Sequence, residues 1–275
     1  DLNSNDITGT GNIDNVGTIT TDGLTVAGNV SVDGGTIKLD GNYPTGTNNV
    51  ALGDGALDDG SLSGGYNVAV GSSALTNNTT GIQNIGIGFD SLGDNTTGRY
   101  NTALGHGTAT VSTTTCYNTA IGYASLNQNT GSNNTALGGK ALQSNTTASN
   151  NTAVGLCSLF ANTTANYNTA FGSASLKANT TGTDNAAFGA LSAQATTTGT
   201  GITAIGLGSL YTNTTGASNT AVGTYSLKSN STASNNTAVG YHSLCANTTG
   251  TQNVAVGSIS AVTNTTGCYN TALGH

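Results

Sequence analysis

The chain has 275 residues and a formal net charge of −7, and only 6% of its residues are charged. It contains no Glu, Met or Trp, one Pro at Pro44, and 41 Gly residues. Low charge excludes a solvated disordered tail, the lack of a long apolar run excludes a membrane-spanning helix, and Gly without a three-residue period excludes collagen. The remaining class is an uncharged, repetitive, β-rich chain.

The range 1–48 is predicted to be a separate Gly-rich segment of short strands. Between positions 16 and 39, apolar residues alternate in three short stretches that are separated by Gly-containing turns, which is typical of β structure. The boundary near Pro44 is also a charge boundary. Residues 1–60 carry nine Asp against one Lys, whereas residues 61–275 carry three Asp against four Lys and Arg.

From position 49 to position 275 the chain repeats. The pattern Asn-x-Ala-φ-Gly, in which φ is apolar, begins fourteen times, with Ile202 in place of the opening Asn in one copy. Eleven of the thirteen spacings between starts are identical, which gives a 17-residue period. Counting positions from the opening Asn, the fifth is Gly in every copy, the third is Ala in all but one, and the ninth is Leu in ten of thirteen complete copies. An Asn-Thr-Thr turn follows in most copies.

Each repeat predicts one coil of a β-solenoid or β-roll. The alternating residues that end in Gly predict a short strand and a bend, positions eight to ten predict a second strand or extended arm, and Asn-Thr-Thr-Gly predicts a turn. No apolar stripe of helical period persists. We therefore expect an all-β fold with thirteen complete coils and a truncated one, extending roughly 60 Å.

The repeat also assigns structural roles. Apolar residues at positions four and nine are predicted to form the core, position-five Gly residues the bends, and the opening Asn residues stacked amide ladders. The predicted core residues are Leu52, Val70, Leu75, Ile87, Leu92, Leu104, Ile121, Leu126, Val154, Leu159, Phe171, Leu176, Val239 and Leu244. The predicted bend residues are Gly71, Gly88, Gly105, Gly155, Gly172 and Gly240.

The thin coil predicts association with other copies of the chain. Two large apolar side chains per coil leave little core to offset the backbone entropy of ordering a whole repeat. Burial of the position-three Ala row against neighbouring chains would supply the missing contact area. The expected assembly is a parallel homotrimer, intertwined or side by side.

Few residues could take part in catalysis or metal binding. A glycan-cleaving enzyme needs two carboxylates at a defined separation, and in the repeats only Asp90 and Asp94 lie close in sequence, without an evident acid/base partner. His106, His242 and His275 are scattered, whereas a metal site needs convergent ligands. We predict no catalytic site, no cofactor and no metal, although threefold symmetry leaves open a site formed by three copies of one His.

The four cysteines lie in different coils and mostly at different repeat positions, so we expect no disulfide within the chain. They are Cys116, Cys157, Cys245 and Cys268. Free thiols that behave as small apolar residues are typical of assembly in a reducing cytoplasm, as for a virion protein.

Tyrosines offer the one candidate binding feature. Tyr100, Tyr117, Tyr167 and Tyr269 each precede an opening Asn, as Tyr66 does. Exposed rings could stack on a host surface glycan, and the alternative is that they pack as corner aromatics on adjacent coils. The nearly neutral repeats have no basic stripe, so no nucleic-acid partner is predicted.

The Asn-Thr-Ala-Val-Gly motif with a following Ser-Leu arm resembles the head repeat of YadA-type trimeric autotransporter adhesins. The matching stretches include residues 151–155, 219–223 and 236–240. This resemblance implies a left-handed parallel β-roll trimer. The Asn-Thr-Thr-Gly insert and the 17-residue period depart from the shorter adhesin repeat and look more like repeats in fibre proteins of tailed phages.

These features lead to one expected function and two alternatives. The expectation is a structural shaft of a phage or virus tail fibre, located on the virion, which joins other fibre or baseplate proteins and positions host-receptor binding. The first alternative is the stalk or head of a bacterial trimeric surface adhesin. The second is an ice-binding solenoid, which is disfavoured because the Thr-Thr doublets of this chain fall in turns.

Overall fold

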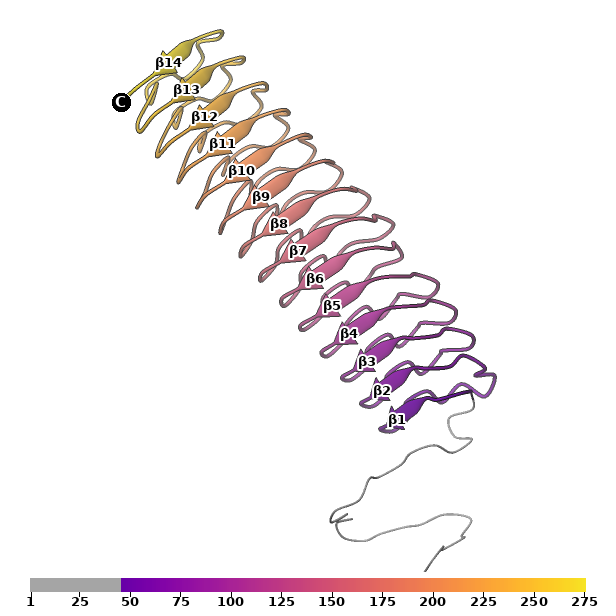
Figure 1. Cartoon of the computed structure of the whole chain (residues 1–275). Coiled ribbons are helices and arrows are strands. Elements are labelled where there is room, and N and C mark those ends of the chain that lie inside the picture. Colours follow the sequence, from indigo (N-terminus) through magenta and orange to yellow (C-terminus); the bar gives the residue numbers. More distant parts are fainter. Residues whose placement is uncertain (1–45) are drawn as a thin grey trace, which may run out of the picture. The chain divides into compact units, whose positions relative to one another are not determined.

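The computed structural model describes residues 46–275, so the short strands predicted between positions 16 and 39 lie outside the described residues. The described residues form a β-solenoid without a helix (Figure 1). The predicted all-β coil with a 17-residue period is therefore confirmed.

Fourteen strands of three residues form one parallel sheet in which the strand order follows the chain order. Each strand pairs with the next in the register of the repeat, so that Ala153 of β7 lies beside Ala170 of β8. The strands are β1 (Val50–Leu52), β2 (Val68–Val70), β3 (Ile85–Ile87), β4 (Thr102–Leu104), β5 (Thr119–Ile121), β6 (Thr135–Leu137), β7 (Thr152–Val154), β8 (Thr169–Phe171), β9 (Ala186–Phe188), β10 (Thr203–Ile205), β11 (Thr220–Val222), β12 (Thr237–Val239), β13 (Val254–Val256) and β14 (Thr271–Leu273).

The fifth position bends the chain at the end of each strand. Gly155 has a φ of 127°, a conformation that disfavours side chains. A Cβ on Gly155 would also lie 2.6 Å from the carbonyl carbon of Gly172 in the next coil. The backbones of successive bends are therefore in direct contact, and the other predicted bend residues share the positive φ: Gly71, Gly88, Gly105, Gly172 and Gly240.

The structure replaces the predicted second strand with a run of turns. In the coil of β7, Cys157 and Leu159 have left-handed φ values of 55° and 47°. Leu159 N–H nevertheless donates to the carbonyl of Ser175 in the next coil, at 3.0 Å. The hydroxyl of Ser158 donates to the Gly155 carbonyl at 3.0 Å, which explains the small polar residue at position eight. This segment must reverse the chain within a thin coil, and an extended arm could not do so.

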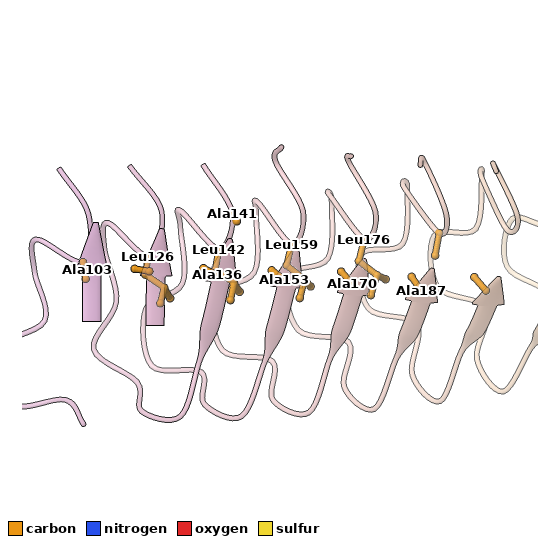
Figure 2. Close-up of a cluster of buried hydrophobic side chains, with 14 of the residues drawn as sticks. Ala103, Leu126, Ala136, Ala141, Leu142, Ala153, Leu159, Ala170, Leu176 and Ala187 are labelled. Carbon is orange, nitrogen blue, oxygen red and sulfur yellow. The ribbon is translucent and has the colours of Figure 1, made fainter. Parts of the chain in front are cut away.

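The core is a single column of Ala and Leu. Ala153 at position three and Leu159 at position nine are both fully buried and face each other across the coil (Figure 2). Where Leu is absent, Ala109 and Ala193 remain buried. The other predicted position-nine core residues are also 0% exposed: Leu75, Leu92, Leu126, Leu176 and Leu244.

The predicted core placement of position four is wrong. Leu52, Leu104 and Phe171 are 48%, 43% and 53% exposed. Because side chains alternate along a strand, the buried Ala at position three places positions two and four on the outer face. Five further predicted core residues are half-buried on that face: Val70, Ile87, Ile121, Val154 and Val239. The position-three Ala row lies inside its own coil, so it cannot pack against another chain.

Two Asn columns fasten the coils together. At position twelve, Asn162 Nδ2 donates to Asn145 Oδ1 at 2.8 Å, and Asn179 Nδ2 donates to Asn162 Oδ1 at 3.0 Å. At position one the amide bonds mainly to backbone: Asn151 Oδ1 accepts from the N–H of Asn168 at 2.9 Å. The main side-chain amide ladder therefore runs through position twelve, whereas sequence reasoning placed it at position one.

Candidate functional site

The outer face of the sheet is the most extensive candidate surface. We call its position-four residues the outer apolar row. It contains Leu52, Val70, Ile87, Leu104, Ile121, Leu137, Val154, Phe171, Phe188, Ile205, Val222, Val239, Val256 and Leu273. Neither position two nor position four carries a charged residue in any strand.

The outer face of the sheet is long and carries no charged side chain. Strands spaced about 4.8 Å apart make the face about 60 Å long, and a three-residue strand is about 10 Å wide, for a total of about 600 Å². This total includes position two, where nine of the fourteen residues are Thr. At position six, just after the Gly bend, Phe89, Leu156 and Tyr241 are also 51%, 59% and 54% exposed. Patches above about 600 Å² mark interaction sites in soluble proteins.

Aromatic side chains on successive coils stack at the pitch of the repeat. The rings of Phe171 and Phe188 lie 6.4 Å apart at 18°. Phe89, His106 and Tyr123 form a second column, with centroid distances of 5.0 and 5.6 Å. Such coil-to-coil contacts order the side chains of one chain and leave their outward surfaces exposed.

The four tyrosines predicted to contact glycans do not form one site. Tyr100 and Tyr117 stack at 4.8 Å and 11° on adjacent coils and are 41% and 60% exposed. Tyr167 and Tyr269 are 61% and 76% exposed and lie on other coils. The structure therefore brings together two of the four rings.

The carboxylates and histidines show no convergent arrangement in the described part of the chain. Partial burial and the charge of Asp94 raise the pKa of Asp90. His242 packs against the rings of Tyr225 and Tyr241, at 5.4 and 4.2 Å. Residues 46–275 contain no group of three or more His, Cys, Asp or Glu side chains that could hold a metal ion.

The four cysteines are free thiols. The N–H and hydroxyl of Thr251 donate to Cys268 Sγ at 3.3 and 3.6 Å, and these bonds lower the pKa of the Cys268 thiol. Burial raises the pKa of the Cys245 thiol. The pKa values of the two thiols are therefore shifted in opposite directions although both lie in the same repeat array.

Sequence reasoning missed one hollow on the surface of the solenoid, which is lined by Leu191, Tyr211, Tyr225 and Lys228. Its signal in the sequence is Gly208, which stands at position seven between Leu191 and Tyr225 of the neighbouring coils. Because Gly208 has no side chain, the Tyr225 ring of the next coil can lie over its backbone.

No helix in residues 46–275 is long and apolar enough to span a membrane. Comparison with protein-family models, curated proteins and solved structures found no match, so no relative supplies a function for the chain.

Proposed function

We propose that residues 49–275 are a rigid shaft segment of an extracellular fibre, the tail fibre of a phage or another virus, which assembles with copies of itself and positions host-receptor binding. The observation that carries this proposal is the unbroken parallel sheet of fourteen strands with a continuous uncharged apolar row on its outer face.

Every part of a coil is bonded to the next coil, which supports a stiff rod. The strand residue Thr152 donates to the carbonyl of Asn168 at 2.9 Å, and the turn residue Leu159 donates to that of Ser175 at 3.0 Å. The hydroxyl of Thr163 adds a bond to the carbonyl of Thr180 at 3.1 Å. Bending the rod would stretch bonds on several sides of the coil at once, so the stack favours one straight geometry.

A second copy of the chain matches the outer apolar row because both surfaces repeat at the same spacing. Side chains of one row can fill the gaps between side chains of the other along the whole length. The outer face of the sheet, with its position-two threonines, offers roughly 600 Å² per copy, which is below but comparable to the about 800 Å² per partner of a stable interface. A threefold arrangement directs all three sheets at one axis and removes the row from water.

The stalk or head of a bacterial trimeric surface adhesin remains the second candidate, because it would use the same rod and the same assembly. The resemblance of the repeat to YadA-type heads supports it. The two candidates differ in the domains to which this segment is joined, a membrane anchor in the adhesin and a virion-attachment domain in the fibre. The exposed rings of Phe171 and Phe188 on the sheet disfavour the flat face that an ice-binding solenoid needs.

Light scattering coupled to size-exclusion chromatography tests the proposal. We expect a mass near three times the 26.9 kDa of one chain, persistent on dilution. Phe171→Asp should lower that mass to one chain because it places a charge in the apolar interface. Thr164→Asp places the same charge at an exposed turn of the preceding coil and should leave the trimer intact.

A monomer at every concentration would refute self-assembly. A trimer that Phe171→Asp leaves intact would refute the outer apolar row as its interface. Electron microscopy of the same samples measures the rod, for which we expect a straight repeat region about 60 Å long.

A further inference from the structure

The hollow at Gly208 is a break in an otherwise periodic surface. It has a volume of about 250 Å³ and is lined by Leu191, Tyr211, Tyr225 and Lys228. All four side chains are half-buried, whereas Gly208 is buried beneath them. Three successive coils therefore contribute to one concave site.

Gly208 sets the position of the Tyr225 ring. A Cβ on Gly208 would lie 2.6 Å from Cε1 and 2.7 Å from Cδ1 of Tyr225, so the ring lies directly over the Gly208 backbone. On its other side, the Tyr225 ring meets His242 edge-on at 5.4 Å and 79°. The ring is thus held between two coils and is oriented before any ligand arrives.

Lys228 supplies a positive charge at the rim. Its Nζ lies 4.9 Å from the centroid of the Tyr225 ring, and it makes no ion pair with any carboxylate among residues 46–275. Three Asp stand against four Lys and Arg in residues 61–275, so this amine is a local charge on a nearly neutral surface. It is free to pair with an anionic ligand.

We propose that this hollow binds a single sugar residue that carries a carboxylate. Because the Tyr225 ring is covered by Gly208 and its neighbours, the Tyr211 ring supplies the apolar face that suits the C–H face of a sugar ring, together with a polar hydroxyl group at its edge. Leu191 extends the apolar wall, and the Lys228 ammonium suits one carboxylate. The volume lies below the range of about 300–1,000 Å³ for drug-sized ligands, which favours one ring over an extended oligosaccharide.

This inference goes beyond the proposed function, because a shaft that serves only as a spacer needs no binding site. In a fibre of several copies, weak sites of this kind would act together through avidity. The site would let the shaft itself contact an acidic surface polysaccharide.

Ligand titration followed by NMR chemical shifts tests the proposal, with glucuronate, glucose and acetate as separate probes. We expect saturable binding of glucuronate, at least tenfold weaker binding of glucose, and no saturation by acetate. Lys228→Gln should weaken glucuronate binding about tenfold. Gly208→Ala should weaken it at least fivefold, because the new methyl group displaces the Tyr225 ring.

The backbone tolerates Ala at this position, since Ala124 and Ala174 occupy position seven with φ values of 52° and 55°. Gly107→Ala is the matched control, because its Cβ would meet only Asn127 Nδ2, at 3.8 Å. Tyr211→Ala provides a second test that leaves the backbone unchanged.

Three results would overturn the site: no saturation by glucuronate, equal binding of acetate, or wild-type affinity in Gly208→Ala and Lys228→Gln. Assembly mass is measured on the same samples. A failure of sugar binding with an intact trimer therefore refutes the site alone, and a monomer that binds glucuronate refutes the assembly alone.

Discussion

The Asn column at position twelve is interrupted at Thr196, and repairing it should stabilise the protein. Asn179 Oδ1 is buried and has no hydrogen-bond partner, because the next coil presents Thr196 in place of Asn. On the other side, Asn213 Nδ2 reaches Thr196 Oγ1 only at 3.4 Å. The next intact step is shorter, since Asn230 Nδ2 donates to Asn213 Oδ1 at 2.9 Å.

Thr196→Asn should restore both bonds. An unsatisfied buried acceptor costs about 1–3 kcal/mol, and a typical hydrogen bond contributes about 0.5–1.5 kcal/mol net. After the cost of burying the new amide, we expect the free energy of unfolding to rise by about 1–2 kcal/mol. The new amide can also donate to the carbonyl of Gly199, which stands where Gly182 stands in the coil before; there the Asn179 amide donates to the Gly182 carbonyl at 2.9 Å.

Urea unfolding of the wild type and the variant measures this change. Thr198→Asn is the control, because it makes the same substitution two residues away at an exposed turn position and should shift stability by less than about 0.5 kcal/mol. If Thr196→Asn is no more stable than Thr198→Asn, the amide column does not contribute to stability in the way that its geometry indicates.

Three further predictions concern the core, the pH dependence and the thiols. In the Phe171→Asp background, which we expect to be monomeric, Leu159→Ala empties a fully buried position and should cost about 2–5 kcal/mol, whereas Val154→Ala on the outer face should cost far less. Equal losses in denaturant unfolding would contradict the assignment of the core. Partial burial and a neighbouring carboxylate raise the pKa of Asp90, so folding disfavours the ionised form of this side chain. The contribution of Asp90 to stability therefore falls as the pH rises from the ordinary pKa of Asp through the raised pKa of the folded state. Asp90→Asn should therefore stabilise the protein at pH 7 and lose this advantage below pH about 3; an advantage that is the same at both pH values would exclude this cause. Cys268 should react with iodoacetamide faster than Cys245 at pH 8, because hydrogen bonds lower the pKa of the Cys268 thiol while burial raises that of the Cys245 thiol. Mass spectrometry of the alkylated peptides measures both rates, and faster alkylation of Cys245 would contradict these pKa shifts.

The repeat itself contains most of the architecture. The 17-residue period, the Gly bend and the strand before it follow from local preferences that recur in every copy, and the structure confirms the coil that they predict. The buried Leu at position nine was also predictable, because Leu or Ala always stands there. A periodic chain repeats the same local conformational preferences in every coil, so a preference that is weak in one coil becomes clear over thirteen.

The sequence alone did not determine which side of each strand faces inward. Alternation allows either position three or its neighbours to be buried, and the larger side chains at position four suggested the wrong choice. In the folded coil, Leu159 and its equivalents already fill the narrow interior, so only Ala fits opposite, as Ala153 does. Apolar residues such as Phe171 are then left on the outer face, which creates the proposed interface.

The hollow at Gly208 likewise depends on tertiary structure. Its lining residues belong to three coils, and their side chains meet only because the solenoid stacks residues that are about 17 positions apart in sequence. The sequence shows a Gly at position seven, but the ring that covers it comes from Tyr225 in the next coil. Local preferences determine the shape of one coil, whereas contacts between coils decide which side chains are buried, exposed or brought together.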